Sequence, residues 1–118
     1  MIKAKIHIKP LSVNKVWQGR RFKTKDYKQY EELVTLALPN GKLGIPVGEA
    51  LSLELTVGLS SKNADLDNVC KPFLDILQKK YKFNDRRVYN IIMTKMSVAK
   101  GKEFIEFRID KLSAPPKP

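Results

Sequence analysis

Residues 50–81 read ALSLELTVGLSSKNADLDNVCKPFLDILQKKY, and this stretch decides the fold that the sequence predicts. Its first ten residues alternate apolar and polar side chains, which predicts a strand with one buried face over residues 50–59. From Val69 to Tyr81 the apolar residues recur at helical spacing, which predicts a helix. A strand that leads directly into a helix is typical of a sheet covered by helices.

Three further strands are expected on either side of this unit. Alternating lysines and apolar residues predict a strand from Ile2 that Pro10 ends. Residues rich in β-forming side chains predict strands over residues 88–99 and 103–110. Because the turn sequence AKGK separates these last two strands, we expect them to form a hairpin.

A second helix precedes the central strand. Thr24 is placed to cap a helix over residues 24–38, and residues 10–23 mix turn formers with basic residues in a way that predicts a loop. The element order β-α-β-α-β-β predicts an α+β domain over residues 1–112 with a single mixed sheet, followed by a mobile tail at residues 113–118. The apolar stripe of the helix is expected to contain Tyr27, Tyr30, Leu33, Val34 and Ala37.

The chain is strongly basic, and its charge is unevenly distributed. Its 118 residues carry 23 Lys and Arg against 12 Asp and Glu, a formal net charge of +11. Residues 1–30 contain nine basic residues and one acidic residue, residues 31–70 two and six, and residues 71–118 twelve and five. Such a chain favours a polyanionic partner, because basic side chains that neutralise phosphates release counterions. The acidic middle segment suits carboxylates that hold a cation beside bound phosphates.

A single cysteine and the lack of a long apolar run exclude several protein classes. Cys70 has no second cysteine in the chain, which excludes an intramolecular disulfide framework and a multi-cysteine zinc cluster. No apolar run approaches the roughly 20 residues that a membrane-spanning helix needs, and residues 1–9 lack the apolar core of a signal peptide. We therefore expect a cytoplasmic protein with no membrane partner.

The densest group of chemistry-bearing residues lies between the strand and the helix quoted above. Asp65 and Asp67 are two residues apart in a segment expected to be extended, which points both carboxylates to one side, toward one hard cation. Asp67, Lys71 and Asp75 follow one another at four-residue spacing, so they share a helix face. Asp85, in the turn after the helix, is a third carboxylate that the fold could bring back beside this pair.

These residues are also compared with two other patterns, a calcium-binding loop and a surface ion pair. An EF-hand also begins with D-x-D, but with Asp65 as its first position Cys70 replaces the required Gly and Ile76 the required Glu. The sequence leaves a second role open for Lys71, that of a partner in a solvent-facing ion pair. Three acids and a lysine suit metal-dependent phosphodiester cleavage, in which a metal activates water and the lysine offsets negative charge in the transition state.

The stretch DLDNVCKPFLD at residues 65–75, followed by NDRRV at residues 84–88, resembles the signature of the RusA family of Holliday junction resolvases. Upstream, PLSVNKVW at residues 10–17 and RRFKT at residues 20–24 are similar to that family's P-x-S-x-N segment and the aromatic and basic residues after it. The resemblance implies a homodimeric, RusA-like endodeoxyribonuclease of bacteria or phages that uses Mg²⁺, with Mn²⁺ as a substitute. Its substrate would be branched DNA, a four-way junction nicked in pairs during recombination and repair.

The resemblance also implies roles for individual residues. Asp65, Asp67 and Asp85 would be the catalytic, metal-binding carboxylates, and Lys71 the catalytic lysine. Asp75 and Asn68 would support the metal-binding and catalytic side chains without binding the metal themselves.

Two positions depart from the family pattern. Asn84 stands where the family commonly has the first aspartate of a pair, and Ala64 stands where some members have a basic residue, which leaves DNA contact there to Lys62 or another segment. Basic residues interleaved with aromatic ones elsewhere in the chain suit contacts with the DNA backbone. The expected nucleic-acid-binding residues are Asn14, Lys15, Arg20, Arg21, Lys23, Arg86 and Arg87.

The sequence is also compatible with two other functions. A basic α+β protein that binds nucleic acid without catalysis explains the net charge equally well, but it gives the acids and Lys71 no role. A metal-dependent nuclease that acts on other branched DNA keeps the site and changes only the substrate.

Overall fold

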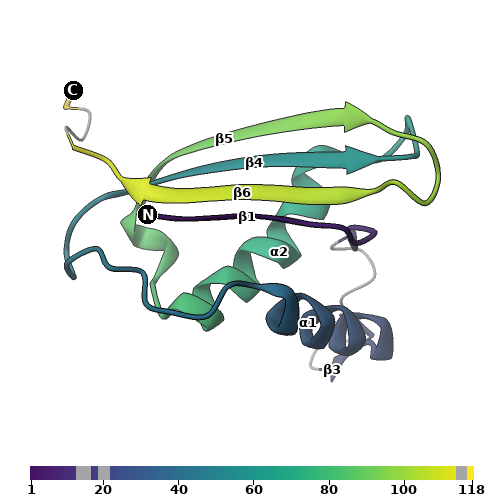
Figure 1. Cartoon of the computed structure of the whole chain (residues 1–118), viewed down its shortest axis with the longest axis horizontal. Coiled ribbons are helices and arrows are strands. Elements are labelled where there is room, and N and C mark those ends of the chain that lie inside the picture. The colour runs from purple at the N-terminus through teal and green to yellow at the C-terminus, as the bar shows by residue number, and fades with distance from the viewer. Residues whose placement is uncertain (13–16, 19–21, 114–116) are drawn as a thin grey trace.

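Four strands form one mixed sheet, and two helices cover one of its faces (Figure 1). The computed structural model describes residues 1–12, 17–18, 22–113 and 117–118. The α+β class, the single domain and the order of its main elements are confirmed. Within the described part of the chain, no helix is long and apolar enough to cross a membrane.

The elements are β1 (Ile2–Ile6), β2 (Trp17–Gln18), β3 (Phe22–Lys23), α1 (Lys25–Ala37), β4 (Leu51–Leu59), α2 (Leu66–Tyr81), the 3-10 turn η2 (Asp85–Arg87), β5 (Val88–Ser97) and β6 (Phe104–Lys111).

One expected segment, the loop before α1, differs from the prediction, and another, the tail, lies partly outside the described residues. The expected loop over residues 10–23 contains a short antiparallel ladder, in which β2 pairs with β3. The expected tail over residues 113–118 stays a prediction, because residues 114–116 lie outside the described residues.

The expected hairpin between β5 and β6 is wrong. The strand order is β1-β6-β4-β5, with β5 parallel to β4 on one side and β6 antiparallel to β4 on the other. The chain therefore crosses the end of β4 between its last two strands. A glycine turn such as the one at Gly101, whose φ is +91°, indicates that the chain reverses direction. It does not indicate which strand the following strand pairs with.

The core lies between α2 and the sheet. Alternate side chains of β4, such as Leu53 and Leu55, are buried against the helix side. Phe73 and Leu77 of α2 are fully buried, and the Phe73 ring meets the ring of Phe107 in β6 edge-on, with centroids 5.6 Å apart. Because burial of one such side chain contributes about 1.5–3 kcal/mol, this layer is the main source of stability.

Helix α1 begins as predicted but buries a narrower face than predicted. The Thr24 side chain accepts a hydrogen bond from the Tyr27 backbone N–H at 3.1 Å, which confirms the cap. The prediction that Leu33 and Ala37 belong to the buried stripe is wrong, because Leu33 is 59% exposed and Ala37 is exposed. The buried band instead continues past the helix end to Leu38. Its members are Tyr27, Tyr30, Val34 and Leu38.

Two contacts hold the segment that crosses the end of β4. The Phe104 ring occupies the space above Gly58, where a Cβ atom would overlap it. The Glu103 carboxylate accepts hydrogen bonds from Ser60 Oγ at 2.9 Å and from the Gly101 N–H at 2.8 Å. A hydrogen bond from its own backbone N–H, followed by the one from Ser60, lowers the pKa of the Glu103 carboxyl.

Gly58→Ala is expected to lower the free energy of unfolding by about 1–3 kcal/mol, because the new methyl group overlaps the Phe104 ring. Urea unfolding followed by circular dichroism measures the change. The double variant Gly58→Ala with Phe104→Leu should regain part of the loss; an Ala variant as stable as the native chain contradicts the packing described.

Glu103→Gln should destabilise the fold at neutral pH but much less at pH 3. The folded-state pKa of Glu103 lies below its usual value of 4.5, so its contribution is complete above that pH and disappears as the pH falls through the folded pKa. Unfolding free energies at several pH values measure this. Glu106→Gln, on the exposed face of the sheet, is the control, and an equal loss for Glu103→Gln at pH 3 and pH 7 refutes the assignment.

Candidate functional site

Helix α2 begins three residues earlier than expected, and this changes the geometry of the acidic pair. It spans Leu66–Tyr81, with Asp65 as its N-cap. Asp67 therefore lies inside the first helical turn, whereas Asp65 keeps extended backbone angles (φ −81°, ψ 127°). The expectation that both residues lie in one extended segment is wrong, whereas their binding of one cation stays a prediction. The sequence placed the helix start at Val69 because the regular apolar spacing begins there.

Both carboxylates are accessible to a ligand at this end of the helix. Asp65 and Asp67 are exposed, and the side chain of Asp65 makes no capping hydrogen bond to the helix. Instead, Asp65 Oδ2 accepts a hydrogen bond from Asn68 Nδ2 at 3.3 Å. Mg²⁺ is commonly held by one or two carboxylates together with substrate phosphates, and these exposed oxygen donors fit such an ion. The positive end of the helix dipole also attracts negative charge here, including that of a phosphate.

Lys71 lies one turn further along α2, as the sequence predicts. Asp67, Lys71 and Asp75 are all within the helix at four-residue spacing, and Lys71 Nζ lies 3.8 Å from Asp75 Oδ1. The side chains of this pair are 63% and 45% exposed. An exposed ion pair of this kind is worth at most about 1 kcal/mol, so Lys71 can exchange Asp75 for another anion at little cost.

Asp85 lies at the opposite end of α2 from the acidic pair. It opens η2, directly after the helix, where its backbone N–H donates to Gln78 Oε1 at 3.1 Å. The sixteen residues of α2 span about 24 Å, so one chain does not bring Asp85 to Asp65 and Asp67. In the described part of the chain, no group of three His, Cys, Asp or Glu side chains is placed to hold a metal ion.

The residues around Asp85 have local structural roles. Asn84 caps η2, because its Oδ1 accepts a hydrogen bond from the Arg86 N–H at 2.9 Å. Arg87 donates to the carbonyl oxygens of Pro46 at 2.7 Å and Glu49 at 3.1 Å, which clamps the preceding loop. The Arg87 guanidinium is thus engaged by the protein, whereas Arg86 is exposed.

Most of the residues expected to bind nucleic acid lie outside the described part of the chain. Asn14, Lys15, Arg20 and Arg21 lie outside the described residues, and only the backbone of Lys23 is described, in β3. Their role in binding nucleic acid stays a prediction.

Sequence reasoning missed Lys95, which anchors the loop that leads to Asp65. Lys95 Nζ donates to the carbonyl oxygens of Lys62 at 3.0 Å and Ala64 at 2.8 Å. Its partner in the sheet is Val57, which is buried, so Lys95 is on the helix side of β5. A lysine at an inward position of an apolar strand was the signal in the sequence, because such a charge needs local partners.

Cys70 is a buried core residue, as predicted. Burial, and then the neighbouring charge of Asp67, raises the pKa of its thiol to about 11. The thiol is therefore neutral at physiological pH and is a poor nucleophile.

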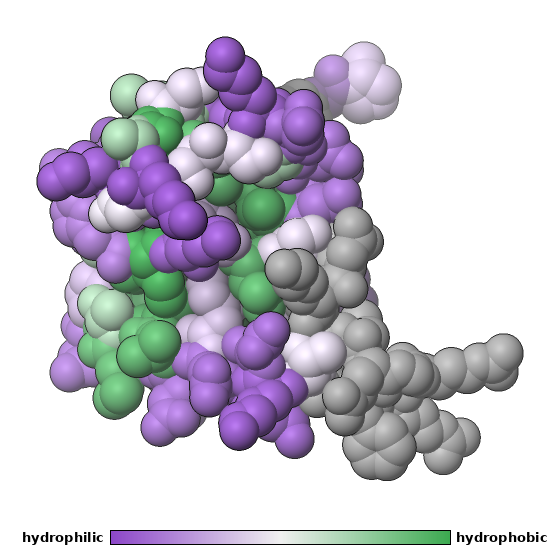
Figure 2. Space-filling view, turned by 90° about the vertical axis from the view of Figure 1, so that its right-hand side faces the viewer, coloured by the Kyte–Doolittle hydropathy of each residue, from purple (hydrophilic) through white to green (hydrophobic). Residues whose placement is uncertain are grey.

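A cleft of about 350 Å³ opens beside the start of α2. It lies near the end of β4, on the side of the molecule that Figure 2 shows, where hydrophobic groups lie among hydrophilic ones. Ala64, the residue before Asp65, and Val69 of α2 both line this cleft. Its lining includes Lys9, Ser12, Asp26, Ser60, Ser61, Ala64 and Glu103.

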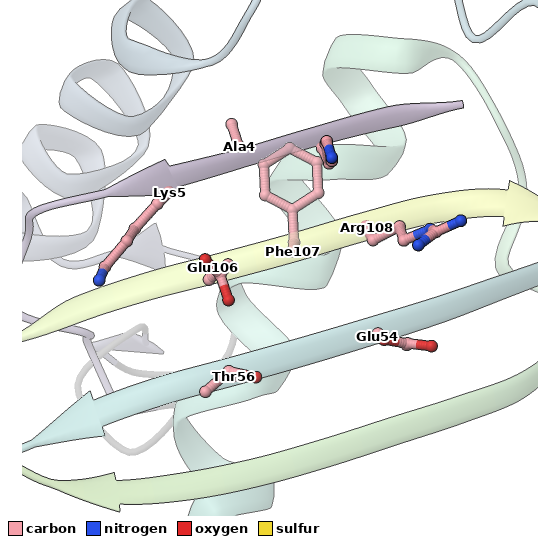
Figure 3. A pocket seen from close by; sticks show the side chains of 8 residues that line it. Ala4, Lys5, Glu54, Thr56, Glu106, Phe107 and Arg108 are labelled. Atoms are coloured by element: carbon pink, nitrogen blue, oxygen red, sulfur yellow. The ribbon is translucent and has the colours of Figure 1, made fainter.

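Another hollow, of about 460 Å³, lies on the open face of the sheet. Figure 3 shows that Lys5, Glu54, Glu106 and Arg108 project from three neighbouring strands around it. These charges are of both signs, and the sheet separates them from α2. This hollow therefore does not belong to the acidic site.

Lys95→Met should loosen the loop before Asp65, because two carbonyl groups lose their donor. We expect trypsin cleavage after Lys62, identified by mass spectrometry, to become about tenfold faster. Lys100→Met removes the same charge from an exposed turn and should leave that rate unchanged. Equal rates for Lys95→Met and the native chain contradict the anchoring role.

Comparison with known proteins agrees with the resemblance found in the sequence. A family model described as Endodeoxyribonuclease RusA matches residues 9–108 of the chain. The matched range includes both ends of α2 and all the acids discussed above. No curated protein matches the chain.

Proposed function

Because the chain belongs to the RusA family of endodeoxyribonucleases, we propose that it resolves four-way (Holliday) DNA junctions by nicking paired strands. The chain is thus an enzyme that hydrolyses DNA, and the non-catalytic alternative falls away. The observation that carries the proposed site is the exposed acidic pair at the start of α2, with Lys71 one turn further on. Recombination and repair in the cytoplasm of a bacterium, or of a cell infected by a phage, are the processes that this activity would serve.

The proposed chemistry uses the residues at the start of α2. Asp65 and Asp67 would hold Mg²⁺, or Mn²⁺ in its place, through their carboxylate oxygens. Such an ion activates water and stabilises charge on the scissile phosphate. Asn68 keeps Asp65 oriented through its hydrogen bond. Lys71 would leave its exposed pair with Asp75 to offset negative charge that develops on the phosphate.

Asp85 joins the proposed site through a second copy of the chain. Within one chain it lies at the far end of α2. In a homodimer, Asp85 of the partner subunit would reach Asp65 and Asp67 and complete a set of three carboxylates. Two-fold symmetry then provides two equal sites, and paired nicks across a four-way junction need two sites.

The basic surface would bind the DNA backbone outside these sites. The net charge of +11 supplies sequence-independent attraction to phosphates. Arg86 and the basic residues between residues 14 and 23 would contact the phosphates, whereas Arg87 maintains the adjacent loop. Residues 1–112 would form the nuclease domain, since β6 ends at Lys111.

Asp67→Asn and Asp85→Asn are each expected to lower the rate of junction nicking about 100-fold or more, because each removes a charged group from the site. A labelled four-way junction, incubated with and without Mg²⁺, measures nicking. Asp67→Asn should bind the junction as well as the native chain or better, because one source of phosphate repulsion is gone. Glu106→Gln removes one charge from the open face of the sheet and is the control for both measurements.

Mixing the two inactive variants tests the shared site directly. In a mixed dimer, one site combines both substitutions, while the other combines native Asp67 with native Asp85 of the partner subunit. Nicking should therefore return when Asp67→Asn and Asp85→Asn chains are refolded together, as single nicks. No recovery refutes the shared site. Metal-dependent cleavage of flaps or forks, but not of four-way junctions, refutes the proposed substrate.

A further inference from the structure

A basic groove lies at the far end of α2 from the acidic pair. It has a volume of about 610 Å³ and is formed between the end of α2 and residues 41–47, which belong to the connection from α1 to β4 (Figure 1). Its charged lining residues are Lys42, Lys80, Lys82 and Arg87, and no acid of the described chain lines it. The three lysines are not among the residues that the sequence led us to expect at the DNA.

These three lysines have no carboxylate partner. Lys42, Lys80 and Lys82 form no ion pair with any described residue. Lys80 Nζ donates a hydrogen bond to the neutral side chain of Asn40, at 3.0 Å. By contrast, Lys79, the residue before Lys80, has a carboxylate oxygen 2.9 Å from its Nζ. Cations that line one groove repel each other, so an anion between them lowers the energy of the arrangement.

The dipole of α2 explains only part of this charge. Cations stabilise the last turn of a helix, because the negative end of the dipole lies there, and this is a sufficient reason for Lys80. It gives no reason for Lys42, which belongs to a different segment. Lys82 has a left-handed backbone with φ of +55°, a conformation that glycine usually provides after a helix. A lysine at this position indicates that its side chain does more than end the helix.

The walls of the groove are fixed by the protein itself. Arg87 donates to the carbonyl oxygens of Pro46 and Glu49. The Tyr81 hydroxyl donates to the carbonyl oxygen of Pro39 at 2.7 Å. Both interactions tie the connection between α1 and β4 to the end of α2. A ligand that enters therefore loses little affinity to the ordering of the walls.

We propose that this groove binds the sugar-phosphate backbone of DNA through Lys42, Lys80 and Lys82. Lysine binds a phosphate as a point charge, and such contacts position a duplex without reading its sequence. The cations come from both walls, and the volume is much larger than one phosphate group. An extended backbone with several phosphates therefore fits the groove better than a single small anion.

The groove lies beside Asp85, and this gives it a place relative to the cut. Lys82 precedes Asp85 by three residues, which span at most about 11 Å, or about three nucleotides along one strand. In the proposed function, Asp85 completes the site of the second copy. The groove of one subunit would then hold the strand that is cut at the acidic pair of the partner subunit. This consequence rests on the proposed function, whereas the phosphate site rests on the groove.

The first test is the salt dependence of DNA binding by the double variant Lys42→Gln with Lys82→Gln. Binding to a four-way junction and to linear duplex is measured in EDTA, which removes the metal that cutting would need. The affinity at about 100 mM salt should fall about tenfold or more. The slope of log affinity against log salt should become shallower by about two, because each lost phosphate contact removes about 0.9.

The matched control is Lys3→Gln with Lys5→Gln, which removes the same charge from exposed positions of β1. It should keep the native slope, because no phosphate contact is lost. Both double variants should keep the native circular dichroism spectrum. A groove variant with the native slope overturns the proposal, and so does a control whose slope changes as much as that of the groove variant.

Photo-cross-linking supplies a second measurement that leaves the lysines intact. Val47 lines the groove and is 95% exposed. Val47→Cys, in a Cys70→Ala background, carries an aryl azide on its single thiol. The azide should link to the cut strand within about five nucleotides of the nick. Glu106→Cys, on the open face of the sheet, is the control and should give no link. No link from position 47 to DNA overturns the proposal.

The two measurements also separate the groove from the proposed function. A shallower slope and a link from position 47 to DNA, in a chain that nicks no junction, refute the proposed function and leave the groove standing. Junctions that are nicked by a chain whose groove variant keeps the native slope do the reverse.

Discussion

The burial of α2 against β4 is the constraint on which the rest of the molecule depends. A helix that connects two parallel strands must run back antiparallel to both of them. Its start therefore lies at one end of the sheet and its end at the other. The acidic pair is attached to the first end and Asp85 to the second. The separation of the carboxylates is thus a consequence of the βαβ connection itself.

Hydrophobic periodicity was sufficient to predict most of the elements, because most of them have one buried and one exposed face; β5, whose side chains are largely exposed, was predicted from its β-forming residues instead. The central strand, the N-cap at Thr24 and the last helical residue, Tyr81, are where the sequence places them. Strand neighbours could not be predicted in the same way. The turn at Gly101 has the same local chemistry whether β6 pairs with β5 or crosses to the far side of β4. The packing of Phe104 against Gly58 belongs to the second arrangement.

The candidate site was predictable where spacing along one helix determines the geometry. The pair of Lys71 with Asp75 follows from a separation of four residues. The start of the helix was less predictable, because Asp65 and Leu66 precede the regular apolar spacing. The position of Lys95 in an apolar strand indicates that it needs partners, but the sequence does not identify them, since they are backbone carbonyls 33 and 31 residues away. The separation of Asp85 from the other acids depends on topology, which residue types do not encode locally.

The position of β6 has a consequence for how the chain folds during synthesis. β6 is the last strand of the sequence, yet it lies between β1, the first strand, and β4. While the chain is still growing on the ribosome, β1 has no partner and β4 lacks one neighbour. The sheet closes only after residue 111 has emerged, and the pairing of β1 with β6, which lie far apart along the chain, is expected to slow the folding of this domain.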